Sequence, residues 1–330
     1  MKTQKRKLDH LQVCLTKDVG FRKTSGFEKY ELVNNALPEM NLDDVDISGR
    51  FLGKPFSAPV FIEAMTGGTA LAGKINRNLA KAARDLGLGM GVGSQRAMIE
   101  DPRLAGTYRV RDVAPDIFLA GNIGATQIRE FGVQKIVEAV ERIGADALAI
   151  HLNAAQEIAQ DDGHVDWKGV LESIKSLRSG TRIPIIVKEV GCGISGEVAV
   201  SLEKAGVSAI DVAGAGGTSW IKVDSLITRK PLENLFDWGI PTAVSLEQCA
   251  RSVRIPLIAS GGIRSGVESA KALAMGASLA GMALPLLKPA TKSGEAVKAV
   301  LEKHIGELEK SMFLVGARNL KELKGKFYRV

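Results

Sequence analysis

Apolar runs of strand length recur along the chain, and helix-length segments with mixed apolar and polar residues separate them. The runs occupy residues 59–65, 88–93, 117–122, 147–153, 184–190, 209–214, 256–260 and 278–284. Continuous apolar runs are typical of strands buried on both faces of a parallel sheet. Several segments between them, at residues 73–86, 131–143, 195–205 and 266–275, carry apolar residues at three- and four-residue spacing. The pattern predicts eight βα units.

Eight βα units in about 230 residues favour the α/β class and a (β/α)8 TIM barrel over a doubly wound open sheet. Unusual polar residues follow nearly every predicted strand, and the carboxyl ends of the strands form the active face of such a barrel. Residues 1–58 precede the first strand, and we expect an N-terminal extension that packs across a barrel end. Residues 222–244 are expected to be an insertion after strand six, placed to act as a lid. We expect one domain, with the barrel over residues 59–330.

Composition narrows the class of protein. The 330 residues are 45% hydrophobic and 25% charged, as in an ordinary globular protein. The net charge of +7 favours anionic ligands, but only 5% of residues are aromatic, which argues against single-stranded nucleic acid as a partner. No apolar run reaches the ~18 residues needed to cross a membrane, and no apolar segment follows the basic N-terminus as in a signal peptide. Three widely spaced cysteines predict reduced thiols and a cytoplasmic location.

Two glycine-rich segments near the C-terminus predict a phosphate site. Residues 259–266 follow the seventh strand and open a helix, and residues 276–283 lead into the eighth strand. Helix N-termini present free N–H groups and the positive end of the helix dipole. Barrels commonly bind phosphate in the loops after strands seven and eight. The alternative is a tight strand-to-helix turn with no ligand.

Glycines and hydrogen-bonding side chains at the ends of other strands predict a large planar cofactor. Thr66 follows strand one, Ser94 follows strand two, Asn122 ends strand three, and Thr218 follows strand six. Glycine permits a close approach of the backbone to a ligand, and each of these side chains can recognise the edge of a heterocycle. Any one of these turns is a weak signal, but their recurrence at successive strand ends indicates a shared ligand.

Lys188 ends strand five inside the predicted barrel mouth. A buried ammonium group needs an anion or a carbonyl oxygen to face. A lysine that faces the pyrimidine ring of a flavin would stabilise negative charge there. Pairing with Glu189 or Asp211 is the alternative. Together with the phosphate site, the lysine predicts FMN as the cofactor.

The segment HLNAAQE at residues 151–157 combines histidine, amide and carboxylate side chains at the end of strand four. One carboxylate, Glu157, is too little for a metal site built from protein alone. It suits Mg²⁺, which keeps several waters and shares the phosphates of a substrate. A helix cap with an exposed glutamate is the alternative.

Arg6, Lys7 and His10 place three potential cations within five residues near the N-terminus. A solvated basic tail is the usual interpretation of such a run. With Arg96 and His151 also available, the set predicts a diphosphate clamp, because guanidinium groups match phosphate oxygens in a bidentate geometry.

These segments, in this order and over nearly the whole chain, resemble the FMN-dependent, type 2 isopentenyl-diphosphate isomerase family. Residues 151–157 and the Arg6-Lys7 pair carry the most specific part of the resemblance, since other FMN barrels share the glycine motifs. The resemblance implies interconversion of isopentenyl and dimethylallyl diphosphate by a 1,3-proton shift in isoprenoid biosynthesis. It implies reduced FMN as the acid and base, Mg²⁺ on the diphosphate, and NADPH or another reductant for the flavin. A homo-oligomer, a tetramer or an octamer, is also implied.

The resemblance implies a role for particular residues. FMN contacts would come from Ala64, Met65, Thr66, Ser94, Asn122, Lys188, Thr218, Gly262, Ile263, Arg264, Ala283 and Leu284. Substrate contacts would come from Arg6, Lys7, His10, Ser94, Gln95, Arg96, His151, Asn153, Gln156 and Trp220. Gln156, Lys188 and His151 would serve catalysis beside the flavin. Glu157 would bind the metal, with Asp224 as a second ligand through water, although the family often has a glutamate at position 224 and a proline at position 154.

Two other functions compete with this interpretation. An FMN-dependent 2-hydroxy-acid oxidase needs a His–Asp base near the late strands, but no histidine lies between His164 and His304. A non-catalytic binder of nucleic acid or of membrane surfaces would use the positive charge. The basic cluster is short, and acidic residues are interspersed with basic ones.

Overall fold

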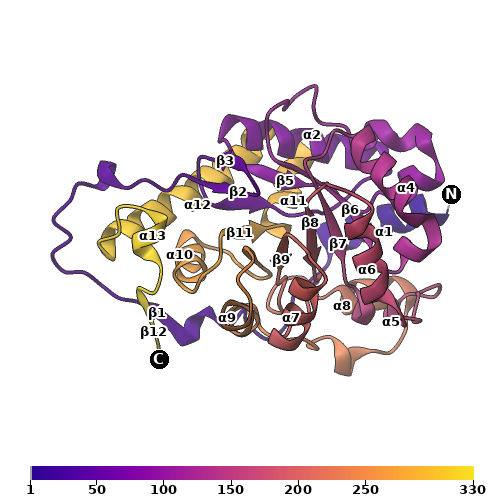
Figure 1. Ribbon diagram of the computed structural model, residues 1–330. Coiled ribbons are helices and arrows are strands. Elements are labelled where there is room, and N and C mark those ends of the chain that lie inside the picture. Colours follow the sequence, from indigo (N-terminus) through magenta and orange to yellow (C-terminus); the bar gives the residue numbers. More distant parts are fainter. Residues whose placement is uncertain (1) are drawn as a thin grey trace.

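Eight parallel strands close into a barrel at the centre of the computed structural model, which describes residues 2–330 (Figure 1). Each strand pairs with the next one along the chain, and the last pairs with the first. The strands are β4 Val60–Ile62, β5 Gly89–Gly91, β6 Leu119–Gly124, β7 Ala147–His151, β8 Ile185–Lys188, β9 Ala209–Asp211, β10 Leu257–Ser260 and β11 Leu279–Met282. The predicted fold class and all eight predicted strands are confirmed.

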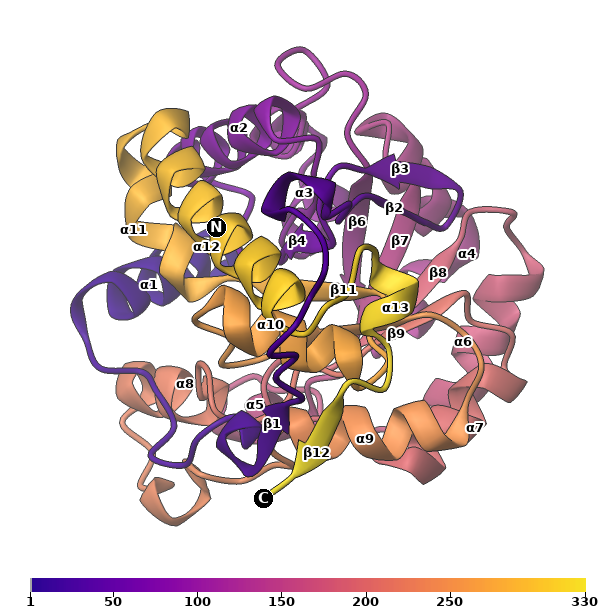
Figure 2. The same ribbon diagram turned by 90° about the vertical axis from the view of Figure 1, so that its left-hand side faces the viewer.

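Helices surround the barrel (Figure 2). The longer ones are α2 Ala70–Asp85, α4 Gln127–Arg142, α6 Val170–Ser179, α7 Gly196–Lys204, α9 Thr242–Ser252, α10 Gly266–Ala274, α11 Leu284–Lys292 and α12 Gly294–Leu314. Short helices are α3 Arg96–Glu100, α5 Ala154–Ala159 and α13 Leu320–Leu323. Thr69, Ser195 and Ser265 start α2, α7 and α10, since each side chain accepts a hydrogen bond from the N–H three residues on. Helix α4 begins four residues before the predicted start, and its backbone is irregular at Gly132, where φ is 76°.

A hairpin from the N-terminal extension closes the amino end of the barrel. Strands β2 (Gly49–Phe51) and β3 (Lys54–Phe56) pair antiparallel. Phe51 and Phe56 pack against Phe118, which lies just before β6, with ring centroids 5.6 Å and 5.8 Å from it. Phe61 on β4 completes the group, at 6.2 Å from Phe118. The interior of an eight-stranded barrel is filled by side chains, and these aromatic rings fill it at the amino end.

The start of the same extension lies at the opposite end. Helix α1 (Lys2–Thr16) packs on α11 and on α8 (Trp220–Thr228) and buries Leu11. In Figure 1, α1, α5 and α8 lie on the right of the barrel and the hairpin lies to the left. A third part of the extension, β1 (Tyr30–Leu32), pairs antiparallel with β12 (Phe327–Arg329) near the C-terminus. The expectation that the N-terminal extension packs across one end is therefore too simple, because residues 2–58 cover both ends.

The insertion after strand six contributes an extra helix at the carboxyl end of the barrel. Helix α8 lies between α1 and α5, and a loop with a short 3-10 helix at Glu233–Leu235 leads from it to α9. Trp238 in this loop is 63% exposed. The loop's role as a lid stays a prediction.

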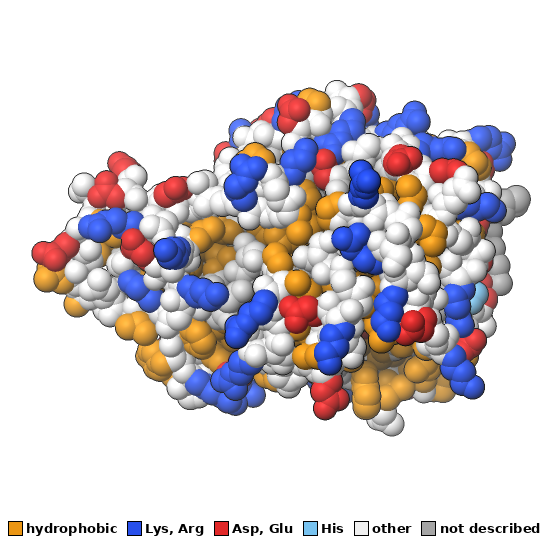
Figure 3. All heavy atoms as spheres, in the orientation of Figure 1, with side chains coloured by type: hydrophobic (Ala, Val, Ile, Leu, Met, Phe, Trp, Pro, Cys, Tyr) orange, Lys and Arg blue, Asp and Glu red, His pale blue; other side chains and the backbone are white. Residues whose placement is uncertain are grey.

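The surface carries mixed charge. Figure 3 shows lysine and arginine side chains spread among acidic and uncharged ones over one face. Among residues 2–330, no helix combines the length and apolar character required of a membrane span.

The packed rings of Phe51, Phe56, Phe61 and Phe118, here called the aromatic plug, give a stability prediction. Phe51→Ala removes a side chain that is 2% exposed, and we expect it to lower the free energy of unfolding by about 3–5 kcal/mol, the usual cost of a cavity of this size. Flavin content should not change, because the plug lies at the end away from the polar strand ends. Urea unfolding and flavin absorbance measure both effects. Arg50→Ala, an exposed position in the same hairpin, is the control and should cost far less.

Candidate active site

A cavity opens at the carboxyl ends of the strands, beneath α1. Its walls come from the segments that follow β4 to β11, together with one face of α1 and the start of α8. The predicted site residues that line it are Arg6, Lys7, His10, Ala64, Met65, Thr66, Ser94, Arg96, Asn122, His151, Asn153, Gln156, Glu157, Lys188, Thr218, Trp220, Gly262, Ile263, Arg264, Ala283 and Leu284. Residues from widely separated parts of the sequence therefore meet at one place.

Two predicted residues do not line the cavity. Gln95 is 1% exposed, donates through Nε2 to the carbonyl of Ala139 and accepts from the N–H of Asn122. The Gln95 side chain therefore hydrogen-bonds to backbone groups within the barrel wall and does not face the cavity. Asp224 is buried behind the cavity, where Gln156 donates to it.

The glycine-rich turn after β10 lies at one end of the cavity. Gly262 has a φ of 78°, and a Cβ there would stand 2.6 Å from the carbonyl carbon of Gly216, so only glycine fits between the two loops. Ser265 and Glu268 form a capping box at the start of α10. The N–H groups of Gly262 and Ile263 make no hydrogen bond within residues 2–330. These free donors at the cavity wall fit a phosphate group.

Hydrogen-bonding groups line the middle of the cavity. Thr66 is 3% exposed, and its carbonyl accepts from Gly93 N–H, which ties the turn after β4 to the turn after β5. The carbonyl of Ser94 accepts from Tyr108 Oη at 2.9 Å and from Lys7 Nζ at 3.0 Å. The strand ends are thus held at fixed positions beside the cavity.

Lys188 lies at the floor of the cavity and faces two carboxyl groups. Its Nζ is 3.2 Å from Asp211 Oδ2 and 3.6 Å from Glu63 Oε2, and it donates to the carbonyl of Glu189 at 2.7 Å. Burial alone would lower the pKa of Lys188, but the two carboxyls raise it above its usual value. Burial, followed by the nearby Asp211, raises the pKa of Glu63 to about 8. The alternative pairing with Asp211 is therefore present, and the lysine still lines the cavity.

Glu63 is not among the predicted site residues. A carboxylate within the otherwise apolar segment 59–65 is a signal for it, because a buried charge needs a reason. Gln160 is also absent from the predicted set, and it lines the cavity beside α1. No spacing in the sequence distinguishes Gln160 from a surface glutamine.

His151 is held in the neutral form. Its Nδ1 lies 2.8 Å from Asn122 Oδ1. Burial, followed by the positive charges of Lys188 and Lys7, lowers the pKa of His151 to about 3. A bound anion would oppose these effects, so the imidazole is placed to gain a proton when an anion enters.

Glu157 faces a buried amide. Its Oε1 accepts from Asn153 Nδ2 at 2.7 Å, and its Oε2 accepts from the N–H of His164 at 2.7 Å. Asn153 Oδ1 is buried and has no hydrogen-bond partner within residues 2–330. Over the same residues, no group of three or more His, Cys, Asp or Glu side chains could hold a metal ion. One carboxylate and a free amide oxygen fit a hard cation only if other ligands complete its shell.

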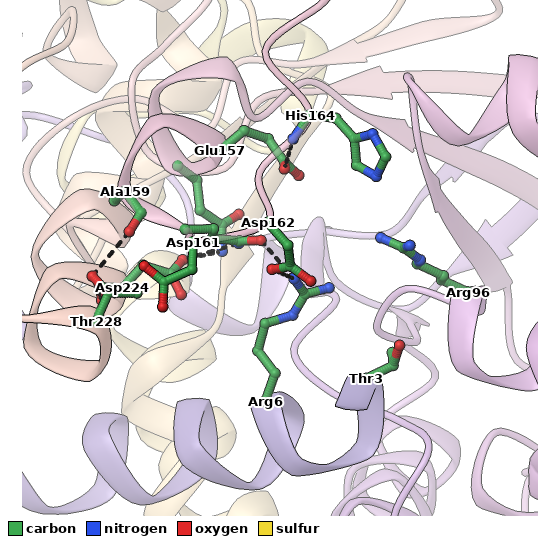
Figure 4. A network of polar contacts seen from close by, with 12 residues as sticks. Thr3, Arg6, Arg96, Glu157, Ala159, Asp161, Asp162, His164, Asp224 and Thr228 are labelled. Carbon is green, nitrogen blue, oxygen red and sulfur yellow. Dashed lines mark hydrogen bonds and ion pairs between the residues drawn. The ribbon is translucent and has the colours of Figure 1, made fainter. Parts of the chain in front are cut away.

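A basic side chain of α1, Arg6, reaches over the cavity (Figure 4). Arg6 points from α1 to Asp162 at 3.1 Å and to Gln160 Oε1 at 2.8 Å, and Arg96 points from α3 toward the same space. Burial, followed by the adjacent Arg6, lowers the pKa of Lys7 to about 8. Cations gathered at one mouth create a positive potential that attracts a multivalent anion.

His10 and Gln156 converge on Asp224 of α8. His10 Nε2 is 2.7 Å from Asp224 Oδ1, and Gln156 Nε2 donates to Oδ2 at 2.8 Å. The His10 ring also meets the edge of Trp220 at a centroid distance of 5.2 Å. Asp224 thus ties α1 to α5 and α8, a role that the sequence pattern does not indicate.

Comparisons with known proteins identify the fold and the family. A family model described as FMN-dependent dehydrogenase matches residues 108–330. A lactate oxidase from Pediococcus acidilactici superposes with a TM-score of 0.75 at 19% identity, covering 100% of this chain and 93% of that one. A mandelate oxidase with an FMN adduct superposes with a TM-score of 0.66 at 17% identity, covering 98% and 91%. The fold and the family match define an FMN-dependent barrel protein.

Sequence relatives narrow the family further. The chain is 49% identical to the isopentenyl-diphosphate delta-isomerase of Pyrococcus furiosus, over 98% of this chain and 86% of that relative. It is 50% identical to the protein of the same name from Methanothermobacter thermautotrophicus, over 97% and 91%. A Nostoc relative of the same name is 46% identical over 98% and 94%. The chain belongs to the isopentenyl-diphosphate delta-isomerase family, as its sequence motifs predict.

The neutral His151 gives a pH prediction. A histidine in the unfolded chain titrates near 6.5, and in the folded protein near 3, so the unfolded state alone takes up this proton as the pH falls below about 6.5. Acidification from pH 7 to pH 5 should therefore lower the free energy of unfolding, and the contribution of His151 to this loss should be up to about 2 kcal/mol. Burial acts on His304 in the same direction, lowering its pKa to about 4.

Urea unfolding at both pH values measures the effect. His151→Asn should show the smaller loss of stability on acidification. His164→Asn, at an exposed histidine, should behave like the wild type. An equal loss in all three proteins would contradict the neutral state of His151.

Proposed function

We propose that this protein interconverts isopentenyl and dimethylallyl diphosphate by a 1,3-proton shift, with reduced FMN as the acid and base and Mg²⁺ on the diphosphate. The membership of the family supports the substrate. The convergence of α1 cations with Arg96 and His151 in the cavity at the strand ends is the single observation that carries the proposal.

The cations at the mouth would bind the diphosphate. Arg6 and Arg96 offer planar donors, and Lys7 offers a compact charge. His151 would become protonated beside the anion, since an opposite charge favours the imidazolium form. Bound in this way, the diphosphate would hold the short isoprenoid chain against the floor of the cavity.

FMN would lie across the strand ends. Its phosphate would meet the free N–H groups of Gly262 and Ile263, with Arg264, Ala283 and Leu284 beside them. Ala64, Met65, Thr66, Ser94, Asn122 and Thr218 would contact the ring system, and Lys188 its pyrimidine end. When bound and reduced, FMN supplies a proton to the alkene and accepts one from the neighbouring carbon. An unactivated alkene is a very weak base, so the protein must keep water away from the electron-poor carbon that forms.

Residues near α5 would complete the reaction site. Gln156 is placed by its hydrogen bond to Asp224 at the cavity wall, where it would face the isoprenoid. Trp220 and α1 would cover the chain and exclude water. Glu157 would bind Mg²⁺ together with phosphate oxygens and waters. Asp224, which lies behind the cavity, would hold Gln156 in place.

The oxidase alternative lacks its base. The carboxyl ends of β9, β10 and β11 place no histidine in the cavity, and His304, on α12, hydrogen-bonds to Ser269 of α10. This placement favours a reaction without a histidine base at the late strands.

NADPH or another reductant for the flavin, a homo-oligomeric state and a cytoplasmic location remain predictions. Light scattering of the purified protein measures the oligomeric state.

The function itself is tested by an anaerobic assay with FMN, Mg²⁺ and isopentenyl diphosphate. Dimethylallyl diphosphate should form only after the flavin is reduced. Product formation with oxidised flavin, or none with reduced flavin, would contradict the proposal.

The α1 clamp predicts a specific kinetic defect. The double variant Arg6→Ala, Lys7→Ala removes two charged contacts to phosphate, each worth about 1.5–3 kcal/mol, so KM for isopentenyl diphosphate should rise by about two orders of magnitude or more. FMN content should be unchanged. Lys5→Ala, an exposed lysine of the same helix, is the control and should change KM little. A loss of flavin with an unchanged KM would assign the two residues a structural role.

The metal role of Glu157 predicts a second defect. Glu157→Gln nearly preserves the shape of the side chain but removes its charge, so we expect it to retain FMN and lose most Mg²⁺-dependent activity. Activity against Mg²⁺ concentration and the thermal midpoint are the measurements. Glu172→Gln, at an exposed glutamate of α6, should match the wild type. Wild-type activity of Glu157→Gln at limiting Mg²⁺ would refute the assignment.

A further inference from the structure

Two acidic side chains from different strands share one lysine beneath the proposed flavin site. Glu63 directly follows β4, Lys188 ends β8 and Asp211 ends β9. They are 4%, 8% and 0% exposed. Two carboxyl groups and one ammonium group therefore occupy the interior of the barrel, away from bulk water.

The hydrogen bonds differ between the two acids. Asp211 Oδ1 accepts from Ser260 Oγ at 2.7 Å and from Ala213 N–H at 3.2 Å, and its Oδ2 faces Lys188. The protein therefore supplies two hydrogen-bond donors to one oxygen of Asp211. Neither Glu63 oxygen, nor Asp211 Oδ2, has a hydrogen-bond partner within residues 2–330.

An ionised Glu63 would be costly. Charges taken out of water must be compensated by partners and hydrogen bonds, and a single lysine already facing Asp211 cannot neutralise a second carboxylate. A proton on Glu63 removes the excess charge. It also gives Glu63 a donor that can be directed at Asp211, the neighbouring carboxyl that acts on Glu63.

We propose that Glu63 and Asp211 hold one shared proton, carried by Glu63 at neutral pH, and that this proton sets the charge beneath FMN and thereby its reduction potential. The proposal rests on the proposed function, because it assumes that FMN binds with Lys188 at its pyrimidine end. Glu63 and Asp211 are positioning residues in this scheme, since they act on the flavin through Lys188.

The barrel is built to accommodate this acid. A Cβ at Gly281 on β11 would collide with Glu63 Oε1 and with Ser260 Cβ, so glycine at that position makes the room. The other titratable groups nearby are occupied elsewhere. Glu189 Oε2 accepts from the N–H groups of Val190 and Gly191, and His151 faces Asn122.

The charge of the cluster determines the effect on the flavin. With Glu63 protonated, Lys188 and Asp211 sum to zero. With Glu63 ionised, the sum is one negative charge, which opposes the negative charge that builds up on a reduced flavin. When Glu63 is ionised, reduction of the flavin therefore favours the uptake of a proton by Glu63. Because of this linkage, the midpoint potential of FMN falls more steeply with rising pH than it does where Glu63 is already protonated. Because burial and Asp211 raise the pKa of Glu63 to about 8, the steeper range lies above that pH.

The test compares the FMN midpoint potential of the holoprotein from pH 6 to pH 10 in three proteins, by dye-equilibrated reduction. In Glu63→Gln the position stays neutral at every pH. Its potential should coincide with that of the wild type at low pH and stay above it at high pH. Glu197→Gln removes the same charge from an exposed position on α7 and should follow the wild type throughout.

The outcomes separate the two proposals. A constant difference between wild type and Glu63→Gln, or none at any pH, overturns the shared proton. If Glu63→Gln does not fold, the wild type alone decides, since a curve without a steeper segment up to pH 10 overturns the proposal. A wild-type protein that binds no FMN overturns the proposed cofactor instead.

Discussion

Charged side chains from the strand ends meet at the barrel mouth in a small volume with little water, and each needs a partner, a proton or a ligand to offset the loss of hydration. This constraint accounts for most of the site. Lys188 keeps its charge because Asp211 faces it. His151 stays neutral because burial, followed by the charges of two lysines, lowers its pKa. Glu63, without a hydrogen-bond partner within residues 2–330, is the acid that the cluster leaves uncompensated.

The same constraint explains the division of the cavity into two halves. Near the mouth, Arg6, Lys7 and Arg96 form a basic rim that attracts a multivalent anion. Acidic side chains at the surface already pair with Arg6 and Arg96, through Asp162 and Glu100. Deeper, Lys188 and its two acids form a nearly neutral floor. A charged head group at the rim and a flat, redox-active ring on the floor are the ligands that this arrangement suits.

The N-terminal extension connects these halves to the rest of the barrel. Its hairpin fills the amino end with aromatic rings, and α1 lies across the carboxyl end. Helix α1 is held there by ion pairs and hydrogen bonds, including those from His10 to Asp224 and from Lys7 to the Ser94 carbonyl. These contacts are polar and lie outside the barrel strands, so contacts to a ligand can replace them without unfolding the barrel.

The sequence alone determined the eight strands, the barrel and the family. The apolar runs that predict the strands are local patterns. Polar residues that follow a buried strand indicate the mouth of a parallel barrel. The motifs at residues 6–10 and 151–157 are specific to the family. Only the tertiary structure decided that Glu63 and Asp211 share Lys188, that Asp224 joins His10 to Gln156, and that Gln95 turns away from the cavity. The reason is that these contacts join strands and helices far apart in the chain. Closure of the barrel and the direction of each side chain set them, and neither leaves a signal in local spacing.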